Sequence, residues 1–297
     1  ALSVSHTRLA ISVTLWWTLN VVFNLANKRC LNAWPHAWAL SATHLAVGST
    51  CMLPLYLPLP RWNLATGGWS CRPVRKLPLV TLSDVSVLLP VVCLLCIGHS
   101  GSTVAPAYGT VAFSNIIKTA EPLFTCALSV LLYRRSFPLA TYASLLAIVA
   151  GVSLFSANDL DFHYFSLIAG MVSNAGYAMY SIRAKAVLQR LPQLSPRELF
   201  AIITLGGCAV LSPIALIFEL CGAGATGVVK DPSNAIRGWK LARLLGFTGF
   251  IQYLSNEIAF CTLPLIHPVT YAVANTMKRS LVVAVSLLFF GRSLPLR

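Results

Sequence analysis

Charged side chains, and acidic ones above all, are scarce in this chain of 297 residues. There are 8 Asp and Glu against 22 Lys and Arg, and charged residues make up 10% of the sequence. A soluble domain averages about 25% charged residues. Such a low content excludes an ordinary water-soluble globular domain and leaves few groups with which to cover a hydrated surface.

The formal net charge of +14 does not indicate a nucleic-acid partner. Most of the cations flank apolar segments, as Arg75 and Lys76 do on one side and Arg134 and Arg135 do on another. Cations in such positions follow the positive-inside tendency and meet the anionic head groups of membrane lipids. We therefore expect membrane lipid, and no nucleic acid, as a partner.

The sequence also lacks the constellations of enzymes and metal proteins. It has no recognisable nucleophile–base pair, metal-ligand cluster or glycine-rich phosphate loop. The nine cysteines are scattered, and the one CxxC pair, Cys93 and Cys96, lies in an apolar segment without a second pair. Packed thiols are the expectation there. We expect no enzymatic activity, no cofactor and no bound metal.

Long apolar segments are what the sequence has in excess. Hydrophobic residues make up 57% of the chain, and segments of about 20 apolar residues, the length of a membrane-spanning helix, recur from end to end. The pattern predicts an all-α polytopic membrane protein with a single integral domain. We expect nine spans, over residues 8–31, 35–59, 82–106, 108–133, 137–157, 163–190, 197–221, 241–262 and 266–290.

Three cations lie inside these apolar segments: Lys118, Lys278 and Arg279. A charge at membrane depth costs about 2.5–3.5 kcal/mol or more, so such a residue usually faces a water-filled cavity. Two ammonium groups and a guanidinium match a phosphate. These residues predict a carrier for a small phosphorylated anion. The alternative for Lys118 is a structural pair with Glu121, which in turn precedes Pro122 and could orient a kinked helix.

The surroundings of Lys118 and Lys278 repeat. Residues 112–118 and 272–278 both read A-x-x-N-x-x-K, 160 residues apart, on the fourth and ninth expected spans. An offset of five spans gives the two copies opposite orientations, the inverted repeat of secondary transporters. We expect one repeat over about 8–157 and an incomplete second over about 163–297. The chain starts at Ala1 and stops at Arg297, and the repeat predicts a tenth span beyond it.

Further polar residues extend the candidate site. His99 and Ser102 lie near the end of the third span, where small polar residues serve either as ligand donors or as packing positions between helices. Tyr180 and Arg183 share one face of the sixth span, and Arg183 either binds substrate or extends to the membrane interface. Tyr253 breaks the apolar eighth span.

Two other polar groups admit different roles. Glu257, also on the eighth span, could neutralise a site cation or carry protons. Asn20, Asn24 and Asn27 recur at helical spacing on the first span, where interhelical hydrogen bonding is the main interpretation.

Four segments resemble the plastid phosphate translocators, the triose-phosphate translocator family of the drug/metabolite transporter superfamily. They read NVVFNLANK at 20–28, HLAVG at 44–48, VAFSNIIKTAEPLF at 111–124 and PVTYAVANTMKR at 268–279. The resemblance implies a ten-helix fold of two inverted five-helix repeats. It also implies that residues matching Lys118, Lys278 and Arg279 hold the phosphate, with help from the positions of His99 and Ser102.

Two positions depart from the family pattern. The sixth-helix arginine of the family aligns with Tyr180, so that Arg183, one turn later, is the candidate replacement. The eighth-helix tyrosine aligns with Ser255, with Tyr253 as its nearest substitute. The phosphate end of the site is thus expected to be intact and the organic end altered.

The resulting expectation is an antiporter in the inner envelope or an equivalent plastid membrane. It exchanges inorganic phosphate for a phosphorylated C3 compound, namely triose phosphate, 3-phosphoglycerate or phosphoenolpyruvate. The main alternative is a nucleotide-sugar and nucleoside monophosphate antiporter of the secretory pathway; a membrane enzyme acting on phospholipid and an anion channel are rivals from other classes. The expected substrate-binding residues are Lys118, Lys278, Arg279, His99, Ser102, Arg183, Tyr253 and Tyr180.

Overall fold

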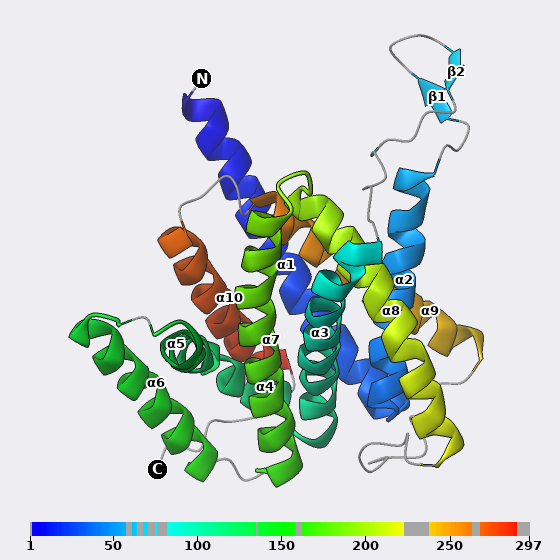
Figure 1. Cartoon of the computed structure of the whole chain (residues 1–297). Helices are drawn as coiled ribbons and strands as arrows, with labels where there is room; N and C mark the ends of the chain where they lie inside the picture. Colours follow the sequence, from blue (N-terminus) through cyan, green and yellow to red (C-terminus); the bar gives the residue numbers. More distant parts are fainter. Residues whose placement is uncertain are drawn as a thin grey trace.

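The chain folds into long helices that run through one body (Figure 1). The computed structural model describes all residues except 1, 58–60, 64–67, 71–74, 76–81, 135, 159–161, 223–237, 263–267 and 290–297. The helices are α1 (Leu2–Ala33), α2 (Ala37–Tyr56), α3 (Leu82–Tyr108), α4 (Val111–Lys118), α5 (Glu121–Tyr133), α6 (Leu139–Asn158), α7 (Tyr164–Arg190), α8 (Pro196–Leu220), α9 (Trp239–Thr262) and α10 (Pro268–Phe289). The predicted all-α polytopic fold is confirmed, with α4 and α5 together forming the fourth expected span.

Four segments of the described residues are long and apolar enough to cross a membrane by length and composition alone. They are Leu9–Ala33, Asp84–Tyr108, Val111–Leu132 and Pro196–Leu220. The helices α9 and α10 are not among them. Both carry polar or charged side chains in mid-helix, Gln252, Asn256 and Glu257 on one and Lys278 and Arg279 on the other, and these lower the local hydropathy.

A small hairpin is the one feature that the helical periodicity did not predict. The strands β1 (Arg61–Asn63) and β2 (Gly68–Ser70) pair antiparallel within the connection between α2 and α3, with Trp62 opposite Trp69. We expected only a polar connection there. The hairpin stands at the end of the molecule to which α2 points with its C-terminus (Figure 1).

The fourth span is broken at Thr119 and Ala120. The Thr119 N–H donates to the Ile116 carbonyl (2.9 Å) and the Ala120 N–H to the Ile117 carbonyl (3.0 Å), so the last turn of α4 tightens and ends. Pro122 follows at the start of α5, where its missing N–H costs nothing. The break leaves the Lys118 carbonyl free of the regular helical pattern.

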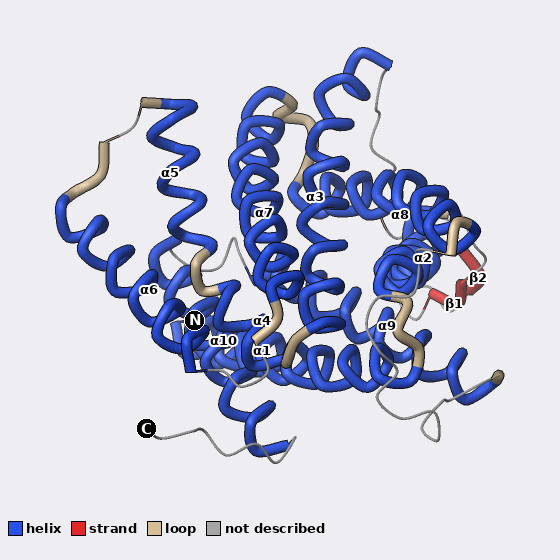
Figure 2. The backbone as a smooth tube through the Cα atoms, turned by 90° about the horizontal axis from the view of Figure 1, so that it is seen from below, coloured by secondary structure: helices blue, strands red, loops and turns tan. Residues whose placement is uncertain are grey.

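The helices contact one another in matched pairs. Contacts of α3 with α7 are mirrored by α1 with α9, those of α2 with α9 by α3 with α8, and those of α4 with α7 by α1 with α10. Each pair converts into the other when α1, α2, α3 and α4 are exchanged for α7, α8, α9 and α10. This supports the repeat that we infer from the A-x-x-N-x-x-K motifs. Figure 2 shows α5 and α6 set to one side of this arrangement.

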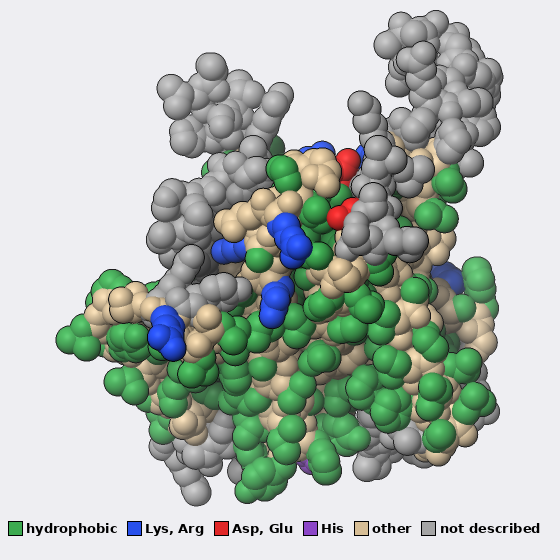
Figure 3. Space-filling model, in the orientation of Figure 1, with side chains coloured by type: hydrophobic (Ala, Val, Ile, Leu, Met, Phe, Trp, Pro, Cys, Tyr) green, Lys and Arg blue, Asp and Glu red, His purple; other side chains and the backbone are tan. Residues whose placement is uncertain are grey.

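The outer surface of the described helices is apolar. Leu139, Leu146, Leu220 and Leu288 expose 83%, 70%, 78% and 84% of their surface, which in water would be an aggregation hazard and in lipid is the expected state. Figure 3 shows a face on which hydrophobic side chains form a broad band, with few charged groups, most of them Lys or Arg. The lipid-facing band and the polar interior together define an integral membrane protein.

Candidate functional site

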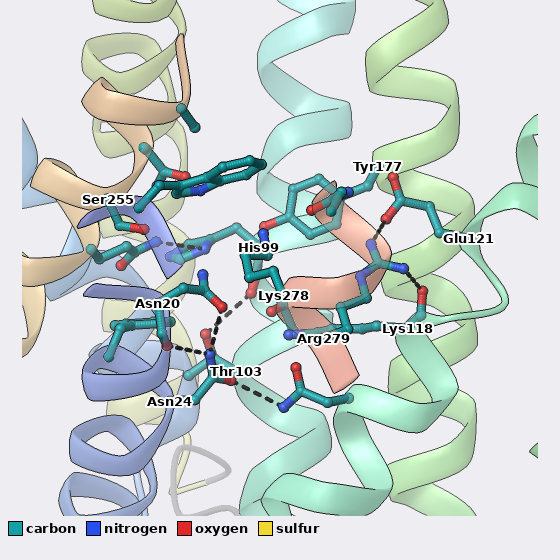
Figure 4. A pocket seen from close by; sticks show the side chains of 18 of the residues that line it. Asn20, Asn24, His99, Thr103, Lys118, Glu121, Tyr177, Ser255, Lys278 and Arg279 are labelled. Carbon is teal, nitrogen blue, oxygen red and sulfur yellow. Dashed lines mark hydrogen bonds and ion pairs between the residues drawn. The ribbon is translucent and has the colours of Figure 1, made fainter. Parts of the chain in front are cut away.

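A cavity of about 280 Å³ lies between helices of both halves (Figure 4). Its walls come from α1, α3, α4, α5, α7, α9 and α10. The lining residues are Trp16, Asn20, Phe23, Asn24, His99, Ser102, Thr103, Asn115, Lys118, Glu121, Tyr177, Tyr180, Ser181, Gln252, Ser255, Asn256, Ala259, Asn275, Lys278 and Arg279.

The three cations from the apolar segments meet in this cavity. Lys118 is the last residue of α4, and Lys278 and Arg279 are neighbours on α10, which runs without a break from Pro268 to Phe289. Neighbouring residues point about 100° apart on a helix, and the cavity accommodates both by extending around α10. The Lys278 ammonium group lies 4.6 Å from the centre of the Trp16 ring, a cation–π arrangement.

Arg279 bridges the two pieces of the broken fourth span. Its Nη1 donates to the Lys118 carbonyl and its Nη2 forms an ion pair with the Glu121 carboxylate (Figure 4). The alternative pair of Lys118 with Glu121 is not formed. Outside the gaps given above, neither Lys118 nor Lys278 has a carboxylate within ion-pair distance. Two of the three cations therefore lack an acidic partner.

The end of α4 is held in place by α7. The Asn174 side chain, fully buried, donates to the Ile117 carbonyl at 2.8 Å. The Ile117 carbonyl, next to Lys118, thus accepts a second hydrogen bond in addition to the one from the Ala120 N–H, and this bond ties the last turn of α4 to α7. The position of Lys118 thus depends on Asn174, a residue on α7 that lies 57 positions from Ile117 in the sequence.

His99 is fixed in orientation by two neighbours. Its Nε2 lies 3.2 Å from the Ser41 carbonyl of α2 and its Nδ1 lies 3.3 Å from the Gln252 amide nitrogen of α9. A carbonyl only accepts and an amide nitrogen only donates, so the neutral tautomer with the proton on Nε2 satisfies both contacts. His99 is 4% exposed, and both of its ring nitrogens already have partners when it lines the cavity.

Asparagines form a wall that the sequence analysis had read mainly as helix–helix contacts. Asn115 of α4 donates to the Asn24 Oδ1 of α1 at 3.2 Å, and Asn24 donates to the Asn20 carbonyl at 2.7 Å. Asn20, Asn24, Asn115 and Asn275 all line the cavity. Bonding between helices and lining the cavity are compatible roles, because Asn24 of α1 accepts a hydrogen bond from α4 and also borders the cavity. The recurrence of asparagine in both repeat motifs was the available signal.

Tyr180 and Ser255, the two positions that depart from the family pattern, both line the cavity, together with Ser102. The structure does not bring Arg183 and Tyr253 there. Arg183 is exposed on α7, and Tyr253 packs toward the core on the α2 side, its Cβ 3.8 Å from the point where a side chain on Gly48 would begin. The substituted residues therefore face the cavity themselves, with their own uncharged side chains.

Glu257 also lies away from the cavity. Its carboxylate pairs with Arg75, which approaches from the connection between α2 and α3 and bonds the Leu55 carbonyl through its backbone N–H (2.9 Å). Glu257 therefore does not neutralise a cation of the cavity, which was one of the two roles suggested for it. Glu121 does so instead for Arg279.

A polytopic helical protein whose two halves enclose a cationic cavity has the architecture of a membrane carrier. The chain belongs to the Triose-phosphate Transporter family, whose model it matches over residues 7–296. It is accordingly a membrane transporter and not an enzyme.

The relatives of this chain are plastid proteins. It is 30% identical over 291 residues to glucose-6-phosphate/phosphate translocator 2, chloroplastic, of Arabidopsis thaliana, covering 97% of this chain and 70% of that protein. It is 30% identical over 283 residues to the chloroplastic triose phosphate/phosphate translocator of Flaveria pringlei, covering 94% and 64%. It is 31% identical over 290 residues to the chloroplastic xylulose 5-phosphate/phosphate translocator of Arabidopsis thaliana, covering 95% and 64%. The chain thus spans about two thirds of the length of these relatives.

Proposed function

We propose that the protein is an antiporter that exchanges inorganic phosphate for a phosphorylated C3 compound across a plastid membrane by alternating access. The observation that carries the proposal is the meeting of Lys118, Lys278 and Arg279 in one cavity between the two halves. Ammonium and guanidinium groups in a confined site are suited to phosphate oxygens. The names of the relatives, all phosphate translocators of chloroplasts, support the same substrate class and compartment.

The size and chemistry of the cavity favour a small solute. Its volume of about 280 Å³ lies just below the roughly 300–1,000 Å³ typical of sites for drug-sized ligands. Triose phosphate, 3-phosphoglycerate and phosphoenolpyruvate are among the smallest organic phosphates, whereas a nucleotide sugar is far larger. The wall around Tyr177, Tyr180, Ser181 and Ser255 is uncharged and offers hydroxyl groups to the organic part. The proposed phosphate-binding residues are Lys118, Lys278 and Arg279, with His99, Ser102 and Tyr180 beside them.

Strict exchange follows from the charge of the empty cavity. Among the described residues Lys118 and Lys278 lack a carboxylate partner, and closing the carrier around two uncompensated cations in a dry site is unfavourable. A bound phosphate removes that barrier, so the loaded carrier crosses between its two states and the empty one does not. Arg279 contributes less to this barrier, because Glu121 already compensates its charge.

The proposal is tested by uptake of labelled phosphate into liposomes that contain the purified protein. The vesicles are preloaded with phosphate, triose phosphate, 3-phosphoglycerate, phosphoenolpyruvate, hexose phosphate, a nucleoside monophosphate or nothing. We expect uptake only into vesicles loaded with phosphate or a C3 compound, and loss of uptake in Lys278→Ala. The matched control is Lys185→Ala, because Lys185 is exposed on α7 and outside the cavity.

Other outcomes would select other functions. Uptake driven best by internal nucleoside monophosphate would replace the proposal by nucleotide-sugar transport. Equal uptake into empty vesicles would point to a channel and contradict the exchange mechanism. Normal uptake by Lys278→Ala would contradict the role of the cavity cations in phosphate binding.

A further inference from the structure

Glu121 is the one acidic side chain among the described residues that line the cavity. The other carboxylates in described ion pairs are engaged elsewhere, Glu257 with Arg75 and Glu219 with His36 (2.7 Å). Glu121 sits in the first turn of α5, directly after the break in the fourth span, and its carboxylate points at Arg279 of α10 (Figure 4). An anion is therefore already present in a site that is otherwise built for one.

The Arg279 guanidinium uses both of its terminal nitrogens in this arrangement. One donates to the Lys118 carbonyl and the other to Glu121. A guanidinium has five N–H donors in one planar fork, so a phosphate bound in the bidentate way takes N–H groups on the same nitrogens or next to them and places its oxygens beside these acceptors. It also brings negative charge next to the Glu121 carboxylate, and like charges at such distances repel strongly in a confined site. Phosphate and the Glu121 carboxylate therefore compete for Arg279, and binding of one weakens the interaction of the other.

We propose that Glu121 is a built-in competitor of the substrate: it holds Arg279 while the carrier is empty and gives up the guanidinium when phosphate binds. The inference rests on the phosphate exchange proposed above and adds a specificity-determining residue to it. The released carboxylate stays near the N-terminus of α5, where the helix dipole favours negative charge, and within three residues of the Lys118 side chain. The N-terminus of α5 and the Lys118 side chain thus offer the released Glu121 carboxylate two alternative favourable interactions.

The competition has opposite effects on binding and release. While Glu121 occupies Arg279, an incoming phosphate must displace it, which weakens apparent affinity. When the phosphate leaves, Glu121 takes its place on Arg279, which lowers the cost of the empty site and speeds release. Removing the carboxylate should therefore tighten binding and slow turnover, whereas losing a merely structural ion pair would weaken binding or unfold the protein.

The test compares phosphate exchange by the wild type and by Glu121→Gln in liposomes preloaded with phosphate. We expect the external phosphate concentration that gives half-maximal exchange to fall about tenfold, since a charged competing hydrogen bond is removed, and the maximal rate to fall as well. The control is Glu198→Gln. Glu198 completes a capping box with Ser195 at the start of α8, far from the cavity, and glutamine supports the same box. It should leave both quantities unchanged.

A second variant keeps the test decisive if Glu121→Gln does not fold. Glu121→Asp retains the charge but is one methylene shorter, so its contact with Arg279 weakens and the half-maximal concentration should still fall. An unchanged or higher half-maximal concentration in a folded variant would overturn the role of Glu121. If the wild type exchanged no phosphate at all, the proposed function itself would fail. The two failures are therefore distinguishable.

Discussion

At the scale of single residues, the two ends of the candidate site are built differently. The end proposed to bind phosphate consists of Lys118, Lys278 and Arg279, with Glu121 as a counter-charge of Arg279. The end formed by Tyr180 and Ser255 has hydroxyl groups where the family pattern has an arginine and a tyrosine. An uncharged organic end cannot fix a second anionic group of a substrate by an ion pair.

Substitutions of two arginines, one in the cavity and one outside it, test whether phosphate binding depends on the cavity. Arg279→Lys replaces a planar fork by a point charge that cannot hold a phosphate in the bidentate way, so we expect the half-maximal phosphate concentration to rise about tenfold. Arg183→Lys, at an exposed position on α7, should leave it unchanged. Phosphate exchange in liposomes measures both. A large effect of Arg183→Lys would show that this side chain enters the transport path after all.

At the scale of elements, the site depends on the close approach of α3 and α7. These helices carry His99, Ser102, Tyr177 and Tyr180, and small residues let their backbones come together. A Cβ on Gly176 would lie 2.8 Å from the Gly98 backbone nitrogen, and the Ser173 hydroxyl bonds the Gly98 carbonyl at 2.7 Å. The two helices therefore behave as one wall of the cavity.

Gly176→Ala tests this wall. The added methyl group meets backbone that cannot move independently, so we expect a destabilisation of about 1–3 kcal/mol and a lower exchange rate as the cavity residues shift. Gly151→Ala on α6 is the control, because no atom lies within 4 Å of the position of its Cβ. Thermal unfolding in detergent and exchange in liposomes give the two readouts. Equal stability of the two variants would contradict the tight contact of α3 with α7.

At the scale of the whole molecule, the charge of the cavity and the repeat architecture act together. Matched helix contacts are consistent with the two halves that the proposed alternating access requires. In this proposal the ammonium groups of Lys118 and Lys278, which have no carboxylate partner among the described residues, determine when the halves move. On this proposal, emptying the site stops the cycle, because the closed state would bury both cations without an anion.

The whole-molecule prediction concerns net transport. Liposomes preloaded with labelled phosphate should retain it in a medium without substrate and release it once external phosphate is added. We expect the ratio of the two efflux rates to be at least about tenfold, the effect of a barrier of roughly 1.4 kcal/mol or more. Comparable rates in both media would mean that the empty carrier crosses freely. Protein-free vesicles give the background leak.

The sequence by itself determined the class of fold, the approximate bounds of the helical spans and the family. Apolar length is a local property, so α3 (Leu82–Tyr108) and α8 (Pro196–Leu220) follow directly from it, and the cost of burying charge made Lys118, Lys278 and Arg279 conspicuous. Only the tertiary structure decided which polar side chains face one another. Glu121 meets Arg279 because α4 ends where α10 packs against it, whereas Arg183 is exposed on α7 and does not line the cavity. Such partners lie far apart in sequence, 91 positions for Asn24 and Asn115 and 158 for Glu121 and Arg279, and no periodicity within one helix encodes them.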